Sequence, residues 1–420
     1  MTNSTPCYAI DFGTSNSLLT YVPPSGSPQM IALEGDNDNI LRSLLYTPEK
    51  NVWYFGQEAI QKYQEYSGEG RFFRSIKKFL AEKNYRGTEI FERKVTIDEL
   101  VSIFLREMKT RADRICQQEV SKVVLGRPAK YSLDPELDQL AEDRMRNAAA
   151  LAGFTEIIFC PEPLAAGLDF ETTVAGEKIV LIADFGGGTS DFTLLKIHPG
   201  KYSSEDVLGI SGIFLAGDAL DGKIMKNFIS THFGRDFEYK VPFGKNVLQF
   251  PRHLLNSLCS PAHITHLGVR DTWEFLKEIQ QGSITEQDRK KLDQLFILVE
   301  EQLGYPLYHK IENAKINLSS LEKTLFEFKQ SGIEIEEIIR RHDFENSVEE
   351  IVEKIVQTML EVFEMSGYRP DQVDHICITG GTAQFPLLKQ RLQNIFGAKK
   401  LTEHKIFQSV VGGLAQFARI

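Results

Sequence analysis

Two short stretches of this chain share one pattern, although they lie far apart. Residues 10–17 read IDFGTSNS and residues 183–191 read ADFGGGTSD. In each, an apolar strand ends at an aspartate, Asp11 or Asp184, a glycine follows two residues later, and small hydroxyl residues come next. A repeat of this spacing predicts two similar lobes, each of which contributes one hairpin to a shared cleft.

The second stretch has the composition of a phosphate-binding turn. The glycines at 186–188 have no side chains, so their backbone N–H groups can approach a phosphate closely, and the Thr189 hydroxyl adds a further donor. Two carboxylates, Asp184 and Asp191, flank the turn. Because a carboxylate repels phosphate, their placement indicates an intervening hydrated Mg²⁺ ion. A glycine-rich hairpin without a ligand is the alternative.

The length and composition of the chain limit its number of domains, its class of protein and its partners. At 420 residues the chain exceeds a single hydrophobic core, so at least two domains are expected, and 42% hydrophobic with 25% charged residues is typical of globular proteins. The formal net charge of -10 argues against nucleic acid and anionic membranes as main partners. Five scattered cysteines without CxxC spacing favour reduced thiols. No signal-like segment and no apolar run of about 18 residues is present, so a cytoplasmic location is expected.

Two segments carry ionisable side chains that could take part in catalysis or ligand binding. Lys77 and Lys78 stand side by side in the basic and aromatic segment 71–83, although a solvated helix face is the ordinary explanation for such lysines. Glu162 lies between two prolines at a rigid strand-to-helix junction. A carboxylate fixed in this way is either an N-cap or a group that positions water.

Two segments in the second half of the chain indicate a ligand site. On a predicted helix over 308–321, Glu312, Lys315 and Ser319 share one face, although an ordinary intrahelical Glu–Lys pair would give the same pattern. A predicted strand ends in a double glycine within 375–381. Such a junction lets the N-terminus of a following helix approach a ligand.

Other segments are scaffold. Thr96 and Glu99 form a capping box that starts a predicted helix over 96–116, and a second amphipathic helix is expected over 348–367. Between residues 225 and 308 the sequence has no regular pattern, which predicts a peripheral subdomain.

Five motifs in a fixed order resemble the ATPase domain of the DnaK-type heat-shock chaperones. They are IDFGTSNS, ADFGGGTSD, EPLAAG, the pattern from Glu312 to Ser319, and ITGGTAQFP at 378–386. The resemblance runs along the whole chain, and GRPAKYS and EPLAAGLDFE are more similar still to the YegD-type branch, which lacks the peptide-binding domain. It implies an α/β, actin-like ATPase fold, in which ribonuclease-H-like duplicated lobes with two inserted subdomains surround a central nucleotide cleft.

The resemblance also implies where the lobes lie. Lobe I would comprise residues 1–177 and 404–420, with a peripheral subdomain inserted at about 38–117. Lobe II would comprise residues 178–403, with a peripheral subdomain inserted at about 219–344.

The same resemblance implies that ATP or ADP and Mg²⁺ bind in the cleft, with the hydrated metal held by Asp11 and Asp184. Lys77 would reach the γ-phosphate, while Glu162 and Asp191 would orient the water and the metal shell. The implied catalytic set is Lys77, Glu162, Asp184, Asp191 and Thr189. The implied nucleotide-binding set is Gly13, Thr14, Ser15, Asn16, Gly186, Gly187, Gly188, Thr189, Gly217, Asp218, Glu312, Lys315, Ile316, Ser319, Gly380, Gly381, Thr382 and Gln384.

The chain also departs from the family pattern. It stops at Ile420, so the family's peptide-binding domain is expected to be absent. The two arginines that sandwich adenine in the family are replaced here by Ile316 and Gln384. The arginine that follows the family's switch proline is replaced near Glu136, although Pro128 remains. The family's interdomain signalling is therefore in doubt for this chain.

Together these inferences predict an ATP-binding, Mg²⁺-dependent ATPase that is chaperone-like or binds partners under nucleotide control. Protein clients or co-chaperone-like partners are implied besides ATP; nucleic acid and membranes are not. A nucleotide-binding interaction module with little hydrolysis is one alternative, and another actin-like protein, such as a kinase of small molecules, is a second. A protein kinase is excluded, because IADFG at 182–186 is accompanied by neither an HRD loop nor a GxGxxG motif.

Overall fold

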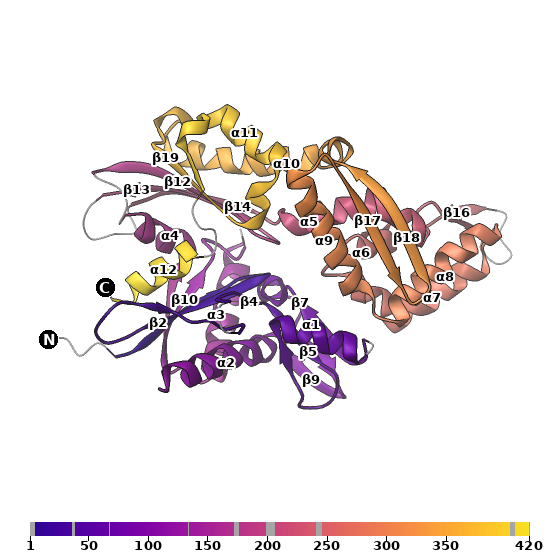
Figure 1. The fold of residues 1–420 in the computed structure, drawn as a ribbon, viewed down its shortest axis with the longest axis horizontal. Helices are drawn as coiled ribbons and strands as arrows, with labels where there is room; N and C mark the ends of the chain where they lie inside the picture. The colour runs from indigo at the N-terminus through magenta and orange to yellow at the C-terminus, as the bar shows by residue number, and fades with distance from the viewer. Residues whose placement is uncertain are drawn as a thin grey trace.

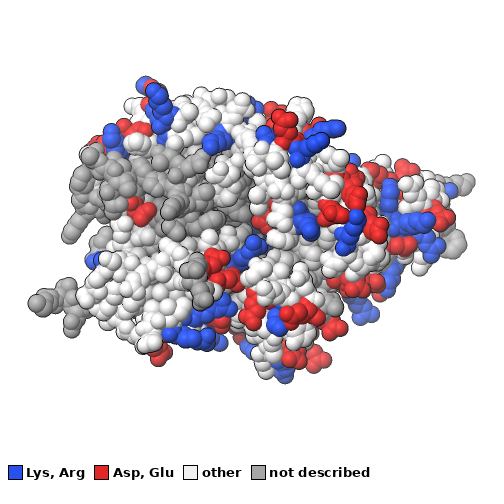
Figure 2. Space-filling model, viewed as in Figure 1, with Lys and Arg blue, Asp and Glu red and all other residues white. Residues whose placement is uncertain are grey.

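The computed structural model describes residues 5–35, 38–66, 68–132, 134–171, 176–198, 206–240, 246–403 and 408–419. In Figure 1 two bodies of mixed helix and sheet lie one above the other, with the N-terminal strands (indigo) in the lower one. An extension of helices and a long β-ribbon reaches sideways from the upper body. On the face in Figure 2, described Lys and Arg side chains are interspersed with Asp and Glu.

Six strands form the first sheet. They are β1 (Cys7–Phe12), β2 (Asn16–Val22), β3 (Gln29–Met30), β4 (Leu41–Arg42), β10 (Lys122–Arg127) and β11 (Glu156–Pro161). Their order is β11-β10-β1-β2-β3, with β4 paired to β2. β1 is antiparallel to β2 and parallel to β10, which is parallel to β11. The carboxyl ends of β1, β10 and β11 therefore lie at one edge of the sheet, and the residues that follow them meet there.

Five strands form the second sheet. They are β12 (Lys178–Phe185), β13 (Ser190–Ile197), β14 (Val207–Ile213), β19 (His375–Thr379) and β20 (Leu401–Glu403), in the order β14-β13-β12-β19-β20. β12 is antiparallel to β13, which sets Asp184 opposite Asp191, and parallel to β19. Each sheet thus contains a hairpin whose first strand is flanked by a parallel strand. The repeat in the sequence is a repeat in the structure.

Helices cover both sheets. They are α2 (Ile97–Cys116), α3 (Pro135–Leu151), α4 (Glu162–Glu171), α10 (Arg341–Ser366), α11 (Pro386–Phe396) and α12 (Gln408–Phe417). The predicted capping box of α2 is present: Thr96 Oγ1 accepts from the Glu99 backbone N–H, and the Glu99 carboxylate accepts from the Thr96 N–H. The helix predicted over 348–367 begins earlier than expected, at Arg341.

The C-terminal helix α12 packs on the first sheet, against α4, β1, β2 and β10, although almost the whole chain separates it from β1. Its Leu414 and Ala415 share a buried cluster with Cys7, Ala9 and Val124. The apolar face of the N-terminal strand is therefore closed by residues from the other end of the chain.

A peripheral group of elements beside the first sheet carries the two adjacent lysines. It comprises β5 (Leu44–Thr47), β6 (Tyr54–Phe55), α1 (Gly56–Glu65), β7 (Arg71–Arg74), the 3-10 helix η1 (Ile76–Ala81), β8 (Gly87–Ile90) and β9 (Arg93–Thr96). Ser75, between β7 and η1, has a left-handed backbone with φ of 58°. This sharp turn directs Lys77 and Lys78, which follow it, towards the cavity described below.

A second peripheral group follows α5 (Gly217–Ile224). It comprises the π-helix η3 (Met225–Ile229), β15 (Glu238–Lys240), β16 (Val247–Gln249), α6 (Arg252–Leu258), α7 (Arg270–Gln281), α8 (Glu286–Glu300), α9 (Gly304–Ser320), β17 (Lys323–Gln330) and β18 (Ile333–Arg340). Although the sequence shows no regular pattern over 225–308, the structure forms helices and strands there. α6 and α7 have no side-chain N-cap, so the sequence signals that mark helix starts are missing for these two helices.

Candidate functional site

The two hairpin turns face each other across a cavity between the bodies. Residues 13–16 line it from the first sheet, and Gly186, Gly187 and Thr189 line it from the second. The turns are closed in the same way, because Gly13 N–H donates to Asn16 O over 3.1 Å and Gly186 N–H donates to Thr189 O over 2.9 Å. A Cβ on Gly187 would collide with Ser15 Oγ, so the two turns approach each other closely at this point.

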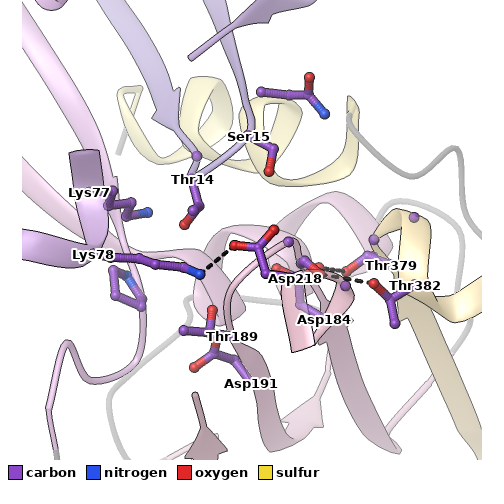
Figure 3. Close-up of a pocket in the computed structure, with 18 of the residues that line it drawn as sticks. Thr14, Ser15, Lys77, Lys78, Asp184, Thr189, Asp191, Asp218, Thr379 and Thr382 are labelled. Carbon is purple, nitrogen blue, oxygen red and sulfur yellow. Dashed lines mark hydrogen bonds and ion pairs between the residues drawn. The ribbon is translucent and has the colours of Figure 1, made fainter. Parts of the chain in front are cut away.

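Four carboxylates gather at the inner end of the cavity, where Figure 3 shows Asp184 and Asp191 below the Thr14 and Ser15 turn. Burial, together with the neighbouring Asp184, raises the pKa of Asp191 to about 7. Burial and the Glu162 carboxylate raise the pKa of Asp11, against the opposing effect of Lys77. Burial also raises the pKa of Asp184, while a hydrogen bond of 2.7 Å from Thr379 Oγ1 to its Oδ1 lowers it.

This excess of negative charge fits a bound divalent cation. Among the residues that the structure describes, Lys77 is the one cation that acts on Asp11, Asp184 and Asp191, and it also pairs with Glu162. An added positive charge would therefore favour the ionised forms of these carboxylates. No three His, Cys, Asp or Glu side chains in the described ranges are grouped closely enough to coordinate a metal directly. An ion held here would therefore keep most of its water ligands, as Mg²⁺ does.

The carboxylate cluster predicts how stability depends on pH. The folded pKa of Asp191, about 7, lies above the value of roughly 3.9 for an unfolded aspartate, so the folded chain holds this proton more tightly. The free energy of unfolding of the nucleotide-free protein should fall as pH rises from about 4 through about 7, the folded pKa of Asp191, and on to about 8, the folded pKa of Asp11. Asp191→Asn should flatten the decline. Thermal melts of both proteins between about pH 5 and about pH 8 test this, and parallel curves would contradict it.

Lys77 and Glu162 form an ion pair beside these carboxylates. Lys77 Nζ lies 2.9 Å from Glu162 Oε1, and both side chains are largely buried. Glu162 is the first residue of α4, directly after β11, so the predicted rigid junction holds it at the strand edge. Burial lowers the pKa of Lys77, but the paired Glu162 outweighs this and raises it, so the ammonium stays charged.

A second ion pair crosses the cavity and was not predicted from the sequence. Lys78 Nζ, from η1, pairs with Asp218, from the first turn of α5, as Figure 3 shows. Arg74 Nη2 lies 3.5 Å from the same carboxylate. The side chain of Lys78 also lies against Gly188, where a Cβ would collide with it. These contacts join the peripheral group of the first sheet to the turn of the second.

The outer half of the cavity is lined by α9. Lys315 Nζ lies 2.9 Å from the buried Asp221 Oδ1 and donates to Gly217 O over 3.3 Å. Burial would raise the pKa of Glu312, but His309, Arg74 and Lys315 outweigh it and lower the pKa to about 2. Glu312 is therefore an ionised acceptor.

The exposed Ile316 adds an apolar wall beside Glu312 and Lys315. Its side chain is 57% exposed, so a flat ligand could lie against it.

The double glycine after β19 lines the remaining side of the cavity. Gly380 has φ of 88°, and a Cβ there would collide with the backbone of Phe185, so the position requires glycine. Thr382 Oγ1 donates to Gly186 O over 3.0 Å, which ties this turn to the glycine turn after β12.

The structure brings most predicted site residues to this one cavity. Three do not line it: Gly188 packs against Lys78, Gln384 is exposed at the end of the 3-10 helix η7 (Gly381–Gln384), and Ser319 Oγ bonds to Lys315 O in its own helix. Lining residues outside the predicted site set are Lys78, Ala81, Pro128, Lys130, Tyr131, Phe214, Asp221, Thr379 and Val410. Two of them could have been found from the sequence, because Lys78 is adjacent to Lys77 and Thr379 is adjacent to Gly380.

Comparison with known proteins decides the family. A model of the Hsp70 protein family matches residues 54–250 and 280–416, which is well over half of the chain. The chain belongs to the Hsp70 family. The predicted resemblance to DnaK-type chaperones is therefore confirmed, and so is the actin-like ATPase fold. Membership of the YegD-type branch stays a prediction, as do the lobe ranges, whose boundary at 404 falls outside the described residues.

One relative of this Hsp70 family member is the chaperone protein DnaK of Thermosipho africanus (strain TCF52B). It is 23% identical over 395 residues, which cover 92% of this chain and 54% of that protein. The chain thus spans about half the length of the relative it matches. No helix in the described ranges is both long and apolar enough to span a membrane.

Proposed function

We propose that this Hsp70 family member binds ATP between its two hairpin turns and hydrolyses it to ADP and phosphate in the presence of Mg²⁺. One observation carries the proposal: two glycine turns with matching hydrogen bonds face each other over a cluster of carboxylates and one buried lysine. Family membership and the match to a DnaK chaperone support it.

The inner residues are assigned roles by their charge. Backbone N–H groups of the two turns, with the hydroxyls of Thr14, Ser15 and Thr189, would bind the phosphates. Lys77 would neutralise the terminal phosphate, and Glu162 would accept a hydrogen bond from the attacking water. Asp11 and Asp184 would hold Mg²⁺, which when bound neutralises phosphate charge. Phosphoryl transfer to water needs such positioning and charge more than covalent chemistry.

The outer residues would bind the nucleoside. Glu312 is an ionised acceptor suited to ribose hydroxyls, and Lys315 is a fixed donor beside it. The exposed side chain of Ile316 and the double glycine Gly380–Gly381 leave room for a flat base.

Ile316 and Gln384 stand where the family has two arginines that sandwich adenine, so we predict weak adenine binding. A guanidinium on an aromatic face contributes roughly 0.5–2 kcal/mol, and about 1.4 kcal/mol changes affinity tenfold. Ile316→Arg combined with Gln384→Arg should therefore tighten ATP and ADP alike, by up to about tenfold, and slow their release without accelerating the chemical step. Calorimetric titration of both nucleotides checks this. Unchanged or weaker binding would show that adenine does not lie between these positions.

An assay of purified protein tests the proposed function. Single-turnover hydrolysis of ATP should depend on Mg²⁺ and yield ADP and phosphate, and EDTA should stop it. Binding of ATP without any turnover would favour the second candidate, a nucleotide-gated interaction module. The pairing of Lys77 with Glu162 supports that candidate, because it engages two groups that hydrolysis requires. Absence of ATP binding would overturn both.

Chaperone-like clients are the third part of the proposal. An Hsp70 family member that binds partners under nucleotide control should retain different proteins with ATP and with ADP. Pull-downs from cell extract in the two nucleotides, and steady-state turnover with and without extract, measure this. Identical sets of retained proteins and unchanged turnover would contradict it.

A further inference from the structure

One tyrosine of the cavity has no role in the function proposed above. Tyr131 lies in the strap 128–132, which follows β10. β10 and β11 are parallel and pair up to their last residues, Arg127 and Pro161. The strap after β10 and Glu162 after β11 therefore emerge side by side at the inner end of the cavity, and Tyr131 and Glu162 both line it.

The ring of Tyr131 is fixed from two sides. Its backbone N–H donates to Asp138 Oδ1 over 2.6 Å, and the guanidinium carbon of Arg127 lies 5.5 Å from the ring centroid. Arg127 is held in turn by both oxygens of Asp138, at 3.1 and 2.9 Å. Tyr131 is only 6% exposed, and turning its ring away from the cavity would break the contact with the Arg127 guanidinium.

The hydroxyl at the end of this fixed ring is unsatisfied. It is shielded from solvent and has no hydrogen-bond partner among the residues that the structure describes. Burial raises the pKa of Tyr131 above its usual range, against the opposing effect of Lys77, so the hydroxyl keeps its proton and can donate. A buried donor without an acceptor is costly, which indicates that an acceptor is supplied in another state of the protein.

The position of this hydroxyl identifies that acceptor. Lys77 and Glu162 line the same end of the cavity, and Glu162 follows the strand beside the one that leads to Tyr131. Of these two side chains only the Glu162 carboxylate accepts hydrogen bonds. In the present structure the Glu162 carboxylate is paired with Lys77, whose Nζ lies 2.9 Å from Glu162 Oε1. If Lys77 turns to a terminal phosphate, as the proposed function requires, Glu162 loses its hydrogen-bond donor. It then remains beside other carboxylates without a donor of its own.

We propose that Tyr131 is a positioning residue whose hydroxyl donates a hydrogen bond to Glu162 when Lys77 leaves it for the terminal phosphate of the nucleotide. The inference rests on the proposed function. Tyr131 then holds the carboxylate that orients water, and it stabilises the triphosphate state without touching the ligand. A nucleoside diphosphate that leaves Lys77 paired with Glu162 gains no affinity from the Tyr131 hydroxyl.

Tyr131→Phe tests this assignment, because it removes the hydroxyl and keeps the ring. The affinity for a non-hydrolysable ATP analogue, measured by calorimetry, should fall about tenfold, since a hydrogen bond to a charged group is lost, while that for ADP should stay within about twofold. The melting temperature of the nucleotide-free variant should be equal or higher, since an unsatisfied group is gone. The matched control is Tyr46→Phe, outside the cavity, where the hydroxyl donates to Glu69 O. It should melt lower and keep both affinities.

A double-mutant cycle with Glu162→Ala separates action on Glu162 from action on the ligand. In the folded Glu162→Ala protein, Tyr131→Phe should have no further effect on analogue affinity. A tenfold loss that persists there would place the hydroxyl on the ligand and overturn the assignment, and so would an unchanged analogue affinity in Tyr131→Phe alone. Either result leaves the proposed function standing if the wild type binds both nucleotides. A wild type that binds neither overturns the proposed function and this inference together.

Discussion

Asp184→Asn should reduce Mg²⁺-dependent ATP hydrolysis by about 100-fold or more, while the protein stays folded. Asp184 is the next-to-last residue of β12 and lines the inner end of the cavity, and Thr379 Oγ1 donates to its Oδ1 over 2.7 Å. The amide keeps the oxygen that accepts this hydrogen bond but loses the negative charge that would hold the metal shell. Single-turnover rates of the purified variant and wild type at saturating Mg²⁺ measure the effect.

The same variant has a second, independent readout. Burial raises the pKa of Asp184, so its charge costs stability above the pKa of an unfolded aspartate. The nucleotide-free Asp184→Asn protein should therefore melt at an equal or higher temperature than wild type near pH 7. Lost activity with a lower melting temperature would indicate a folding defect. Undiminished turnover would contradict the assignment of Asp184 to the metal.

Lys77→Ala should lower the single-turnover rate of bound ATP by about 100-fold and change nucleotide affinity by no more than a few-fold. Its ammonium lies beside the inner carboxylates, where charge on the transferred phosphoryl group would develop, and away from the part of the cavity that α9 lines. Rapid mixing followed by acid quench measures the rate, and calorimetry measures the affinity.

Two other lysines define the controls for this experiment. Lys83, which is 73% exposed and does not line the cavity, is the matched substitution, and Lys83→Ala should change neither quantity. Lys78 lines the cavity but pairs with Asp218. If Lys78→Ala loses turnover and Lys77→Ala retains it, the catalytic role belongs to Lys78.

The features that the sequence predicted are those with local causes. The two hairpins follow from apolar strands that stop at Asp11 and Asp184 and from the glycines after them, and the start of α2 follows from its capping box. Glu162 could be placed because adjacent prolines restrict the backbone on both sides. Each of these signals lies within a few residues of the structure it determines.

The features that escaped prediction depend on partners distant in the sequence. Lys78 meets Asp218 across the cavity, and nothing near either residue specifies the other. Thr379 reaches Asp184 because β12 and β19 pair in parallel with these two residues in register. The buried, unsatisfied hydroxyl of Tyr131 could be found only once the packing around it was known.

The position of α12 has a consequence for the order of folding during synthesis. Leu414 and Ala415 cover a face of the first sheet that includes Cys7 and Ala9, strand residues that are synthesised long before α12. At about 5–20 residues per second, roughly 20–80 s pass between the synthesis of β1 and that of α12. During that interval the N-terminal strands have only a partial core, and their uncovered apolar face is open to ribosome-associated chaperones. This Hsp70 family member should therefore itself need chaperones on the ribosome, and ribosome-bound chains that stop before residue 408 should be more sensitive to protease than those that include α12.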